Sequence, residues 1–526
     1  MPLLRPLPRA VTRPVSLLVV VAWAGVMGLL VHRSYIASAS VNLATDLARY
    51  GSGATWRGIY YRGDKVGFTV SETVPTEAGY ELHEDGRLQM NLLGQTSPAA
   101  LRTTARVDRE FALQSFEFSL DPGTGAVKVS GVVQRSDAGR PRLALAITTP
   151  GAPPRTEVRD LDQPPMLSLN LSRLLASGRL VEGTTHRLTL FDPATLRNAP
   201  VTVTVGNREI VRSDDRTVPA FRVSMEFQGL ETVSWVTDTG EVVREESPLG
   251  LISVVEDAAR AQNFVVSGRM RSDLLTAAAI VPEMRYRIDE PRDVTGLTLA
   301  LSGVDLSQYD LDGVGQSLAG RVLTMTDPRD AVAGAEPVSI DAYLAPEPFI
   351  ESDAPEVRQE VEAALAGAPA DARARAERLV RYVNALLEKK PTVSLPSARE
   401  VLRTRVGDCN EHTALYVAMA RAAGIPARIN VGLVFMRGGF YYHAWPEVFI
   451  ADLPPEGGSH SARGYWLPVD PTLNEFPANT THVRLLRGGL ERQADILPLI
   501  GRLNIAVTDV QFAPGTVPVL VGGEQP

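Results

Sequence analysis

The sequence predicts an α+β fold class, with one N-terminal transmembrane helix, a β-rich sandwich or open barrel, and a C-terminal part that mixes helices with strands. Three observations give this order. A charge-free apolar run occupies residues 15–31, short alternating strands recur over residues 50–270, and helical spacing begins near Asp353. Because these patterns follow one another along the chain, we expect them to form separate parts.

Bulk composition restricts the class of protein. The chain has 526 residues, which at roughly 100–200 residues per domain corresponds to several domains. Hydrophobic residues make up 44%, too few for a protein that crosses a membrane many times. The net charge of -8 gives no sign of the basic surface that nucleic acid requires. We therefore expect no nucleic-acid partner.

The apolar run at residues 15–31 has the length of a membrane-spanning helix. At 1.5 Å per residue it would extend about 26 Å, close to a hydrocarbon core of about 30 Å. Arg5, Arg9 and Arg13 precede it, so the positive-inside rule places the N-terminus in the cytoplasm. A cleaved signal peptide is the alternative, because Ala37 and Ala39 resemble a small-residue cleavage site. The sequence predicts a single-pass protein of the cytoplasmic membrane, anchored by residues 1–36, with the remainder facing the periplasm or the cell exterior.

Residues 50–270 form the predicted β-rich domain. Alternating runs occur at residues 55–61, 126–133 and 201–205, and Gly, Asp and Pro residues separate them. This spacing is typical of antiparallel sheets packed as a sandwich or open barrel. Residues 271–350 continue as shorter strands and loops, so we expect a small β module or a linker there.

Helical spacing defines the next predicted part, at residues 351–490. Residues 355–366 and 371–388 are rich in alanine, and Pro391 ends the second segment. One face of that segment carries its apolar residues, which predicts core packing; they are Ala376, Leu379, Val380, Val383 and Leu387. Residues 491–526 are expected to be a C-terminal extension.

The chain has a single cysteine, Cys409, which cannot form an intrachain disulfide. A free cysteine is often a small buried hydrophobic residue. Here, however, Asp408 can cap a helix and Glu411 follows three residues later, as in a capping box. Cys409 then lies in the first turn, where unpaired N–H groups and the helix dipole favour a thiolate. The position indicates a reactive thiol.

Two further residues complete a possible catalytic set. Residues 440–450 read as a strand that carries His443 and Trp445 on one face, and a second strand at residues 465–469 ends at Asp470. An imidazole can generate the thiolate that attacks an amide, and a carboxylate can fix the tautomer of that imidazole. We therefore predict Cys409 as nucleophile, His443 as base and Asp470 as orienting acid.

His412 is the main alternative base, because it lies three residues after Cys409 on the same predicted helix. We expect it instead to support the site, together with Asp408, Glu411 and Trp445. One cysteine and dispersed histidines do not match zinc spacing, so no metal and no cofactor are expected.

Three blocks in chain order resemble the transglutaminase core of the transglutaminase-like superfamily. They are GDCNEH at residues 407–412, YHAWPEV at residues 442–448 and WLPVDPT at residues 466–472. The resemblance extends over about residues 355–485, and residues 394–402 resemble the lead-in of bacterial members. It implies a papain-like core with the cysteine helix packed on an antiparallel sheet. It also implies acyl chemistry through a thioester, on a Gln side-chain amide or a peptide bond.

Two functions follow as hypotheses. The first is a membrane-anchored cysteine acyltransferase or hydrolase that acts on a protein or peptide substrate. The second is a catalytically silent binding or assembly protein on the same fold, because members of the superfamily include cross-linking enzymes, proteases, deamidases, peptide N-glycanases and proteins that have lost catalysis. The presence of all three predicted catalytic residues favours the first.

Overall fold

The computed structural model describes residues 50–521, apart from residues 52, 93–94, 123–125, 136–138, 150–153, 195, 214–215, 228–229, 248–249, 264–277, 331–337, 391–395 and 452–460. The chain divides into two units, Met1–Ala54 and Thr55–Pro526, and every helix and strand below belongs to the second. The predicted anchor at residues 15–31 lies outside the described residues. Within the described ranges, no helix is both long and apolar enough to cross a membrane.

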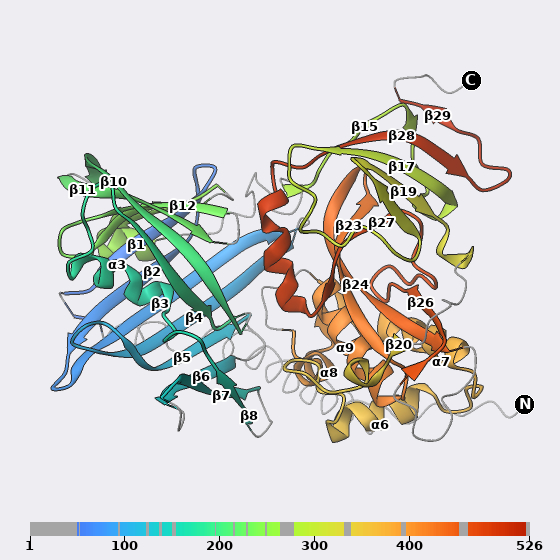
Figure 1. Ribbon diagram of the computed structural model, residues 1–526, viewed down its shortest axis with the longest axis horizontal. Coiled ribbons are helices and arrows are strands. Elements are labelled where there is room, and N and C mark those ends of the chain that lie inside the picture. The colour runs from blue at the N-terminus through green and yellow to red at the C-terminus, as the bar shows by residue number, and fades with distance from the viewer. Residues whose placement is uncertain are drawn as a thin grey trace, which may run out of the picture. The chain divides into compact units, whose positions relative to one another are not determined.

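One 14-stranded antiparallel sheet occupies the first part of the second unit (Figure 1). Its strands are β1 (Thr55–Tyr61), β2 (Asp64–Pro75), β3 (Gly79–Leu92), β4 (Gln95–Asp108), β5 (Leu113–Asp121), β6 (Val127–Arg135), β7 (Pro141–Thr148), β8 (Arg155–Asp160), β9 (Thr185–Asp192), β10 (Arg197–Ser213), β11 (Arg216–Phe227), β12 (Leu230–Val236), β13 (Val242–Glu246) and β14 (Leu251–Glu256). Consecutive strands pair within β1–β8 and within β9–β14, and β1 also pairs with β14. The spatial order therefore runs from β8 through β1 and β14 to β9.

Alternation along these strands gives the sheet an apolar face. In β5, Phe116, Phe118 and Leu120 are buried, while the residues between them are more exposed. Helix α3 (Ser168–Ala176) connects β8 to β9 and packs Leu171 and Leu175 against valines of β10 and β11. The short helix α4 (Ala258–Gln262) follows β14 and contacts β1 and β2.

A second, five-stranded sheet has the order β15-β28-β17-β19-β18. Its strands are β15 (Glu283–Met284), β17 (Val294–Ser302), β18 (Gln316–Ala319), β19 (Val322–Thr326) and β28 (Asn504–Phe512). Three two-stranded pairs accompany it: β16 (Tyr286–Arg287) with β29 (Val519–Leu520), β20 (Val338–Ser339) with β25 (Ser461–Ala462), and β21 (Glu388–Lys389) with β22 (Val406–Gly407). Short 3-10 turns are η2 (Pro291–Asp293), η3 (Pro328–Asp330) and η4 (Asp341–Tyr343). Strand β28 thus joins a late segment of the chain to strands formed some 200 residues earlier.

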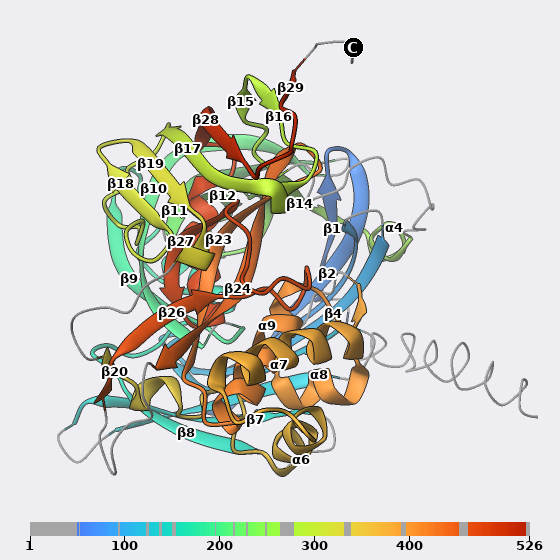
Figure 2. The same ribbon diagram turned by 90° about the vertical axis from the view of Figure 1, so that its right-hand side faces the viewer.

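The third sheet has four antiparallel strands in the order β26-β24-β23-β27. They are β23 (Ala427–Met436), β24 (Gly439–Ala451), β26 (Gly464–Pro468) and β27 (His482–Gly488). Helix α9 (Cys409–Ala422) packs on β23 and β24, and the 3-10 helix η5 (Leu490–Leu499) packs on β23 and β27. Figure 2 shows α6 (Pro355–Ala364), α7 (Ala372–Leu386) and α8 (Ala398–Thr404) gathered around α9. One hydrophobic core joins these helices to the four-stranded and five-stranded sheets.

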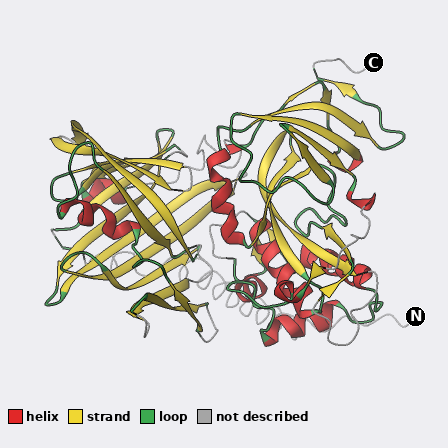
Figure 3. Cartoon of the chain, in the orientation of Figure 1, coloured by secondary structure: helices red, strands yellow, loops and turns green. Residues whose placement is uncertain are grey.

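The predicted α+β class is wrong for this chain. The described part of the protein is mostly β, with 51% of the described residues in strands and 19% in helices (Figure 3). The predicted N-terminal transmembrane helix has no counterpart among the described helices. A two-sheet sandwich is also wrong for residues 55–256, because β1–β8 and β9–β14 each pair consecutively and the pairing of β1 with β14 joins them into one sheet.

Gly432 permits the close packing of β23, β24 and β27 beside His443, its partner in the register of β23 and β24. A Cβ atom at this position would lie 2.1 Å from the carbonyl oxygen of Val483 and 3.0 Å from the Trp445 ring. We predict that Gly432→Ala destabilises the protein by about 1–3 kcal/mol, the usual cost of overpacking. Urea denaturation of the full chain measures this. Gly439→Ala is the control, because its nearest contact would be 3.3 Å, and equal stability of the two variants would contradict the prediction.

Candidate active site

Cys409 is the first residue of α9, and the local sequence explains why the helix begins there. The side chain of Asp408 accepts a hydrogen bond from the backbone N–H of Asn410 at 2.9 Å. The carboxylate of Glu411 accepts one from the N–H of Asp408 at 2.8 Å, which completes a capping box. Asp408 and Glu411 therefore support the site by fixing the start of the helix that carries the thiol.

The thiol of Cys409 is partly buried and lies against β24. Burial raises its pKa well above the ordinary value, and the negative charges of Asp408, Glu411 and Asp470 raise it further. A hydrogen bond with the backbone of Ala444, the residue after His443, acts in the opposite direction. The resting site therefore favours a neutral thiol, and a thiolate requires a base that accepts its proton.

His443 lies on β24. One contact orients its imidazole ring, and another fixes the position of the strand. The indole of Trp445 stacks on the imidazole, with ring centroids 5.9 Å apart and planes inclined by 17°. One turn after Cys409, the hydroxyl of Thr413 donates a hydrogen bond to the carbonyl of Ala444 at 3.1 Å. Helix α9 and the strand that carries His443 are thus tied together at Ala444.

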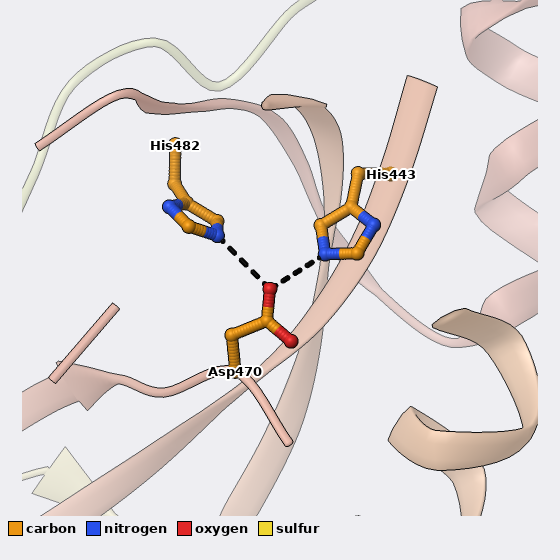
Figure 4. Close-up of side chains that lie close together, drawn as sticks. All are labelled: His443, Asp470 and His482. Carbon is orange, nitrogen blue, oxygen red and sulfur yellow. Dashed lines mark hydrogen bonds and ion pairs between the residues drawn. The ribbon is translucent and has the colours of Figure 1, made fainter. Parts of the chain in front are cut away.

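Asp470 follows β26 and is fully buried. Its Oδ2 accepts a hydrogen bond from His443 Nε2 at 2.7 Å (Figure 4). Its Oδ1 accepts two more, from the backbone N–H groups of Thr472 at 2.7 Å and Leu473 at 2.9 Å. Although burial alone would raise the pKa of this carboxyl, the charge and hydrogen bond of His443, with those of His482, hold it far below its usual value. Asp470 is therefore ionised.

The tautomer of His443 follows from this contact. A carboxylate accepts hydrogen bonds, so Nε2 of His443 carries the hydrogen. In the neutral imidazole, Nδ1 is then the nitrogen that can accept a proton. In this arrangement a carboxylate fixes the tautomer of the base, and the structure brings His443 and Asp470 together in this way.

His412 is buried on α9, and its contacts do not favour a role as the catalytic base. Its Nδ1 lies 2.7 Å from the carbonyl oxygen of Asp408, an acceptor, so this nitrogen carries the hydrogen. Its buried Nε2 has no hydrogen-bond partner among the described residues. Burial lowers the pKa of His412, which favours the neutral form. Among the described residues, no carboxylate forms a hydrogen bond with His412, in contrast to His443.

Sequence analysis missed His482, the first residue of β27. Its Nε2 lies 3.1 Å from the same Asp470 Oδ2 that His443 contacts, and Figure 4 shows both rings directed at this oxygen. No local motif marks His482. It reaches Asp470 because β27 pairs with β23, and this long-range pairing is not visible in the sequence pattern.

His443, Asp470 and His482 offer three possible ligand atoms within 4.8 Å of one another. Both imidazoles, however, direct Nε2 at one carboxylate oxygen at hydrogen-bond distance. A metal ion would have to replace the hydrogens of both nitrogens. We therefore interpret the cluster as a hydrogen-bond network.

Comparison with known proteins places this site in a family. Residues 359–471 match the family model of the transglutaminase core, described as the transglutaminase-like superfamily. Residues 359–471, which include Cys409, His443 and Asp470, therefore form a transglutaminase-like core within the chain. A search of curated proteins found no match.

Three solved structures share weak overall similarity with the chain. A "Beta-barrel-like Protein of Domain of Unknown Function DUF1849" from Brucella abortus has 15% identity and a TM-score of 0.31, covering 39% of this chain and 97% of its own. A "Putative Cysteine Protease" from Cytophaga hutchinsonii has 15% identity and a TM-score of 0.24, covering 44% and 90%. A "putative protease" from Parabacteroides distasonis has 11% identity and a TM-score of 0.18, covering 62% of each chain. At these TM-scores the similarities support no conclusion about activity.

The charge of Asp408 provides a test of the electrostatics around the thiol. Asp408→Asn keeps a good N-cap residue but removes a negative charge that raises the pKa of Cys409. We predict that the inflection of Cys409 alkylation by iodoacetamide moves to lower pH by roughly 0.5–1 unit, because the thiolate becomes easier to form. Alkylation rates measured across pH check this.

Asp371→Asn is the matched control, because Asp371 is also an N-cap aspartate, which accepts a hydrogen bond from the N–H of Ala374 at the start of α7. We expect its profile to match that of the unmodified protein. An unchanged inflection in Asp408→Asn would show that this carboxylate does not act on the thiol.

Proposed function

We propose that this protein is a cysteine enzyme that cleaves or transfers acyl groups of protein or peptide amides through a thioester on Cys409. The observation that carries the proposal is the hydrogen bond between His443 Nε2 and Asp470. His443 lies on β24, the strand that also contacts the thiol through the backbone of Ala444. A buried, ionised carboxylate behind a histidine is the usual support for a general base.

The proposed reaction begins with proton transfer from the Cys409 thiol to Nδ1 of His443. The sulfur attacks the amide carbonyl carbon, and the amine leaves with the proton from His443, so that a thioester remains. Water or a second amine then attacks the thioester carbon, and the thiol is restored. The backbone N–H of Cys409, at the first turn of α9, is a candidate donor to the oxyanion.

Asp470 supports both halves of this cycle in the proposal. Its negative charge stabilises the imidazolium that forms after proton transfer, and its hydrogen bond keeps Nδ1 free for the thiol. Trp445 limits rotation of the same ring through the stacking contact. A Gln side-chain amide and a peptide bond are both suitable substrates, since each offers a carbonyl carbon and a nitrogen leaving group, ammonia from the Gln side chain and an amine from the peptide bond.

The raised pKa of Cys409 favours a second candidate function, a catalytically silent binding or assembly protein. Burial and three carboxylates oppose the thiolate, and a site that never forms one would not catalyse acyl transfer. The two functions differ in whether His443 increases the reactivity of the thiol.

We predict that His443→Ala lowers the rate of Cys409 alkylation by a factor of about 10², the usual scale for loss of a general base. His412→Ala should lower it much less, because its Nδ1 is bonded to its own helix. Asp470→Asn should fall between them, because the imidazole survives with a poorly fixed tautomer. Cys409 is the only cysteine, so labelling followed by intact mass reports this site alone.

Two controls complete the experiment. Cys409→Ala should take up no label, and His186→Ala, a histidine of β9 in the 14-stranded sheet, should react like the unmodified protein. Equal rates for His443→Ala and the unmodified protein would support the silent function. A greater loss in His412→Ala than in His443→Ala would contradict the choice of base.

A further inference from the structure

We propose that His482 is a protonated positioning residue that holds Asp470 in place and offsets its charge. This inference rests on the proposed function, because it assigns a role toward the same site. His482 is distinct from the base, since His443 lies on β24 beside Ala444, whose backbone contacts the thiol, whereas His482 approaches the carboxylate from β27 (Figure 4).

Hydrogen bonding determines the protonation of His482. Its Nε2 lies 3.1 Å from Asp470 Oδ2, and its Nδ1 lies 3.1 Å from the backbone carbonyl oxygen of Asn479. Both partners are acceptors, and a neutral imidazole has only one N–H. A neutral ring would therefore direct a lone pair at an oxygen atom in a buried site. The imidazolium satisfies both contacts.

The charges around His482 favour the same form. Burial opposes the positive charge, but the hydrogen bond and charge of Asp470, together with Glu475, raise the pKa of His482 above its ordinary value. On β24, the rings of His443 and Trp445 face it, with centroids 5.8 Å and 5.2 Å away. Arg484, two residues along β27, donates to the carbonyl of Asp312 and lies 4.0 Å from Glu447.

The position of Asn479 is itself fixed by a carboxylate. Glu475 accepts hydrogen bonds from the backbone N–H of Asn479 at 2.9 Å and from its side-chain amide. Arg292 donates to Glu475 at 2.9 Å from outside the loop. The carbonyl that holds Nδ1 of His482 is thus held rigidly, so the ring cannot easily turn away from Asp470.

Two effects on the reaction follow. With His482, the carboxylate of Asp470 accepts four hydrogen bonds, two on each oxygen, so it cannot rotate away from His443. The positive charge of His482 also favours loss of a proton by the Cys409 thiol. Removing this charge must shift deprotonation of Cys409 to higher pH.

His482→Gln tests the charge separately from the hydrogen bond, because the amide can donate near the position of Nε2 but carries no charge. We expect the inflection of Cys409 alkylation to move to higher pH by about one unit. His186→Gln, the same change in the 14-stranded sheet, should leave it in place. A purely structural role would lower the melting temperature of His482→Gln without moving the inflection, and that result would overturn the proposal.

Nitrogen NMR of the full chain labelled with ¹⁵N-histidine gives an independent measurement. The protein has seven histidines, so the signals lost in His482→Gln identify His482. If the Gln variant does not fold, His482→Asn replaces it. We expect both nitrogens of His482 to be protonated at pH 7.5, and a neutral tautomer there would overturn the proposal. If Cys409 is unreactive at every pH, the proposed function fails, while this spectrum still decides the state of His482.

Discussion

The hydrogen bond between His443 Nε2 and Asp470 Oδ2 is the contact on which the rest of the site depends. It requires β24 and the end of β26 to be adjacent, and these strands pair directly from Glu447 to Ala451. It requires a desolvated carboxylate with enough donors to remain ionised, and the turn after Asp470 supplies two of them. It also decides which ring nitrogen is free, so the chemistry available to Cys409 is set by a contact that does not involve the thiol.

Opposing effects act on the pKa of the Cys409 thiol, and the local sequence reveals only some of them. The helix N-terminus is worth about 0.3–1 kcal/mol to a nearby anion. Two unit charges about 4 Å apart interact with an energy of roughly 4 kcal/mol at an effective dielectric constant of about 20. Burial of the thiol, which is the largest effect, and the neighbouring carboxylates together outweigh the helix, which is why the pKa of the thiol is raised although its position at a helix start suggested a thiolate. The base then becomes the decisive group.

Local patterns predicted the parts of the site that local structure creates. The capping box from Asp408 to Glu411 and the alternation that places His443 beside Trp445 are both present. What the sequence could not supply is pairing between distant segments. His482 reaches Asp470 through the pairing of β27 with β23, and β1 meets β14 about 195 residues later. Alternation with a period of two predicts a strand but not its neighbours, so the extent of the sheets, and with it the fold class, was misjudged.

The position of β28 between β15 and β17 has a consequence for biosynthesis. Ile505 and Val507 of this strand belong to the same core as Leu299 and Leu301 of β17 and the apolar side of α9. The ribosome synthesises Cys409 and its helix well before residues 504–512 exist. This core therefore cannot be completed during translation of the earlier segments. Until β28 emerges from the ribosome, the nascent chain must keep the exposed edges of β15 and β17 from pairing with other strands.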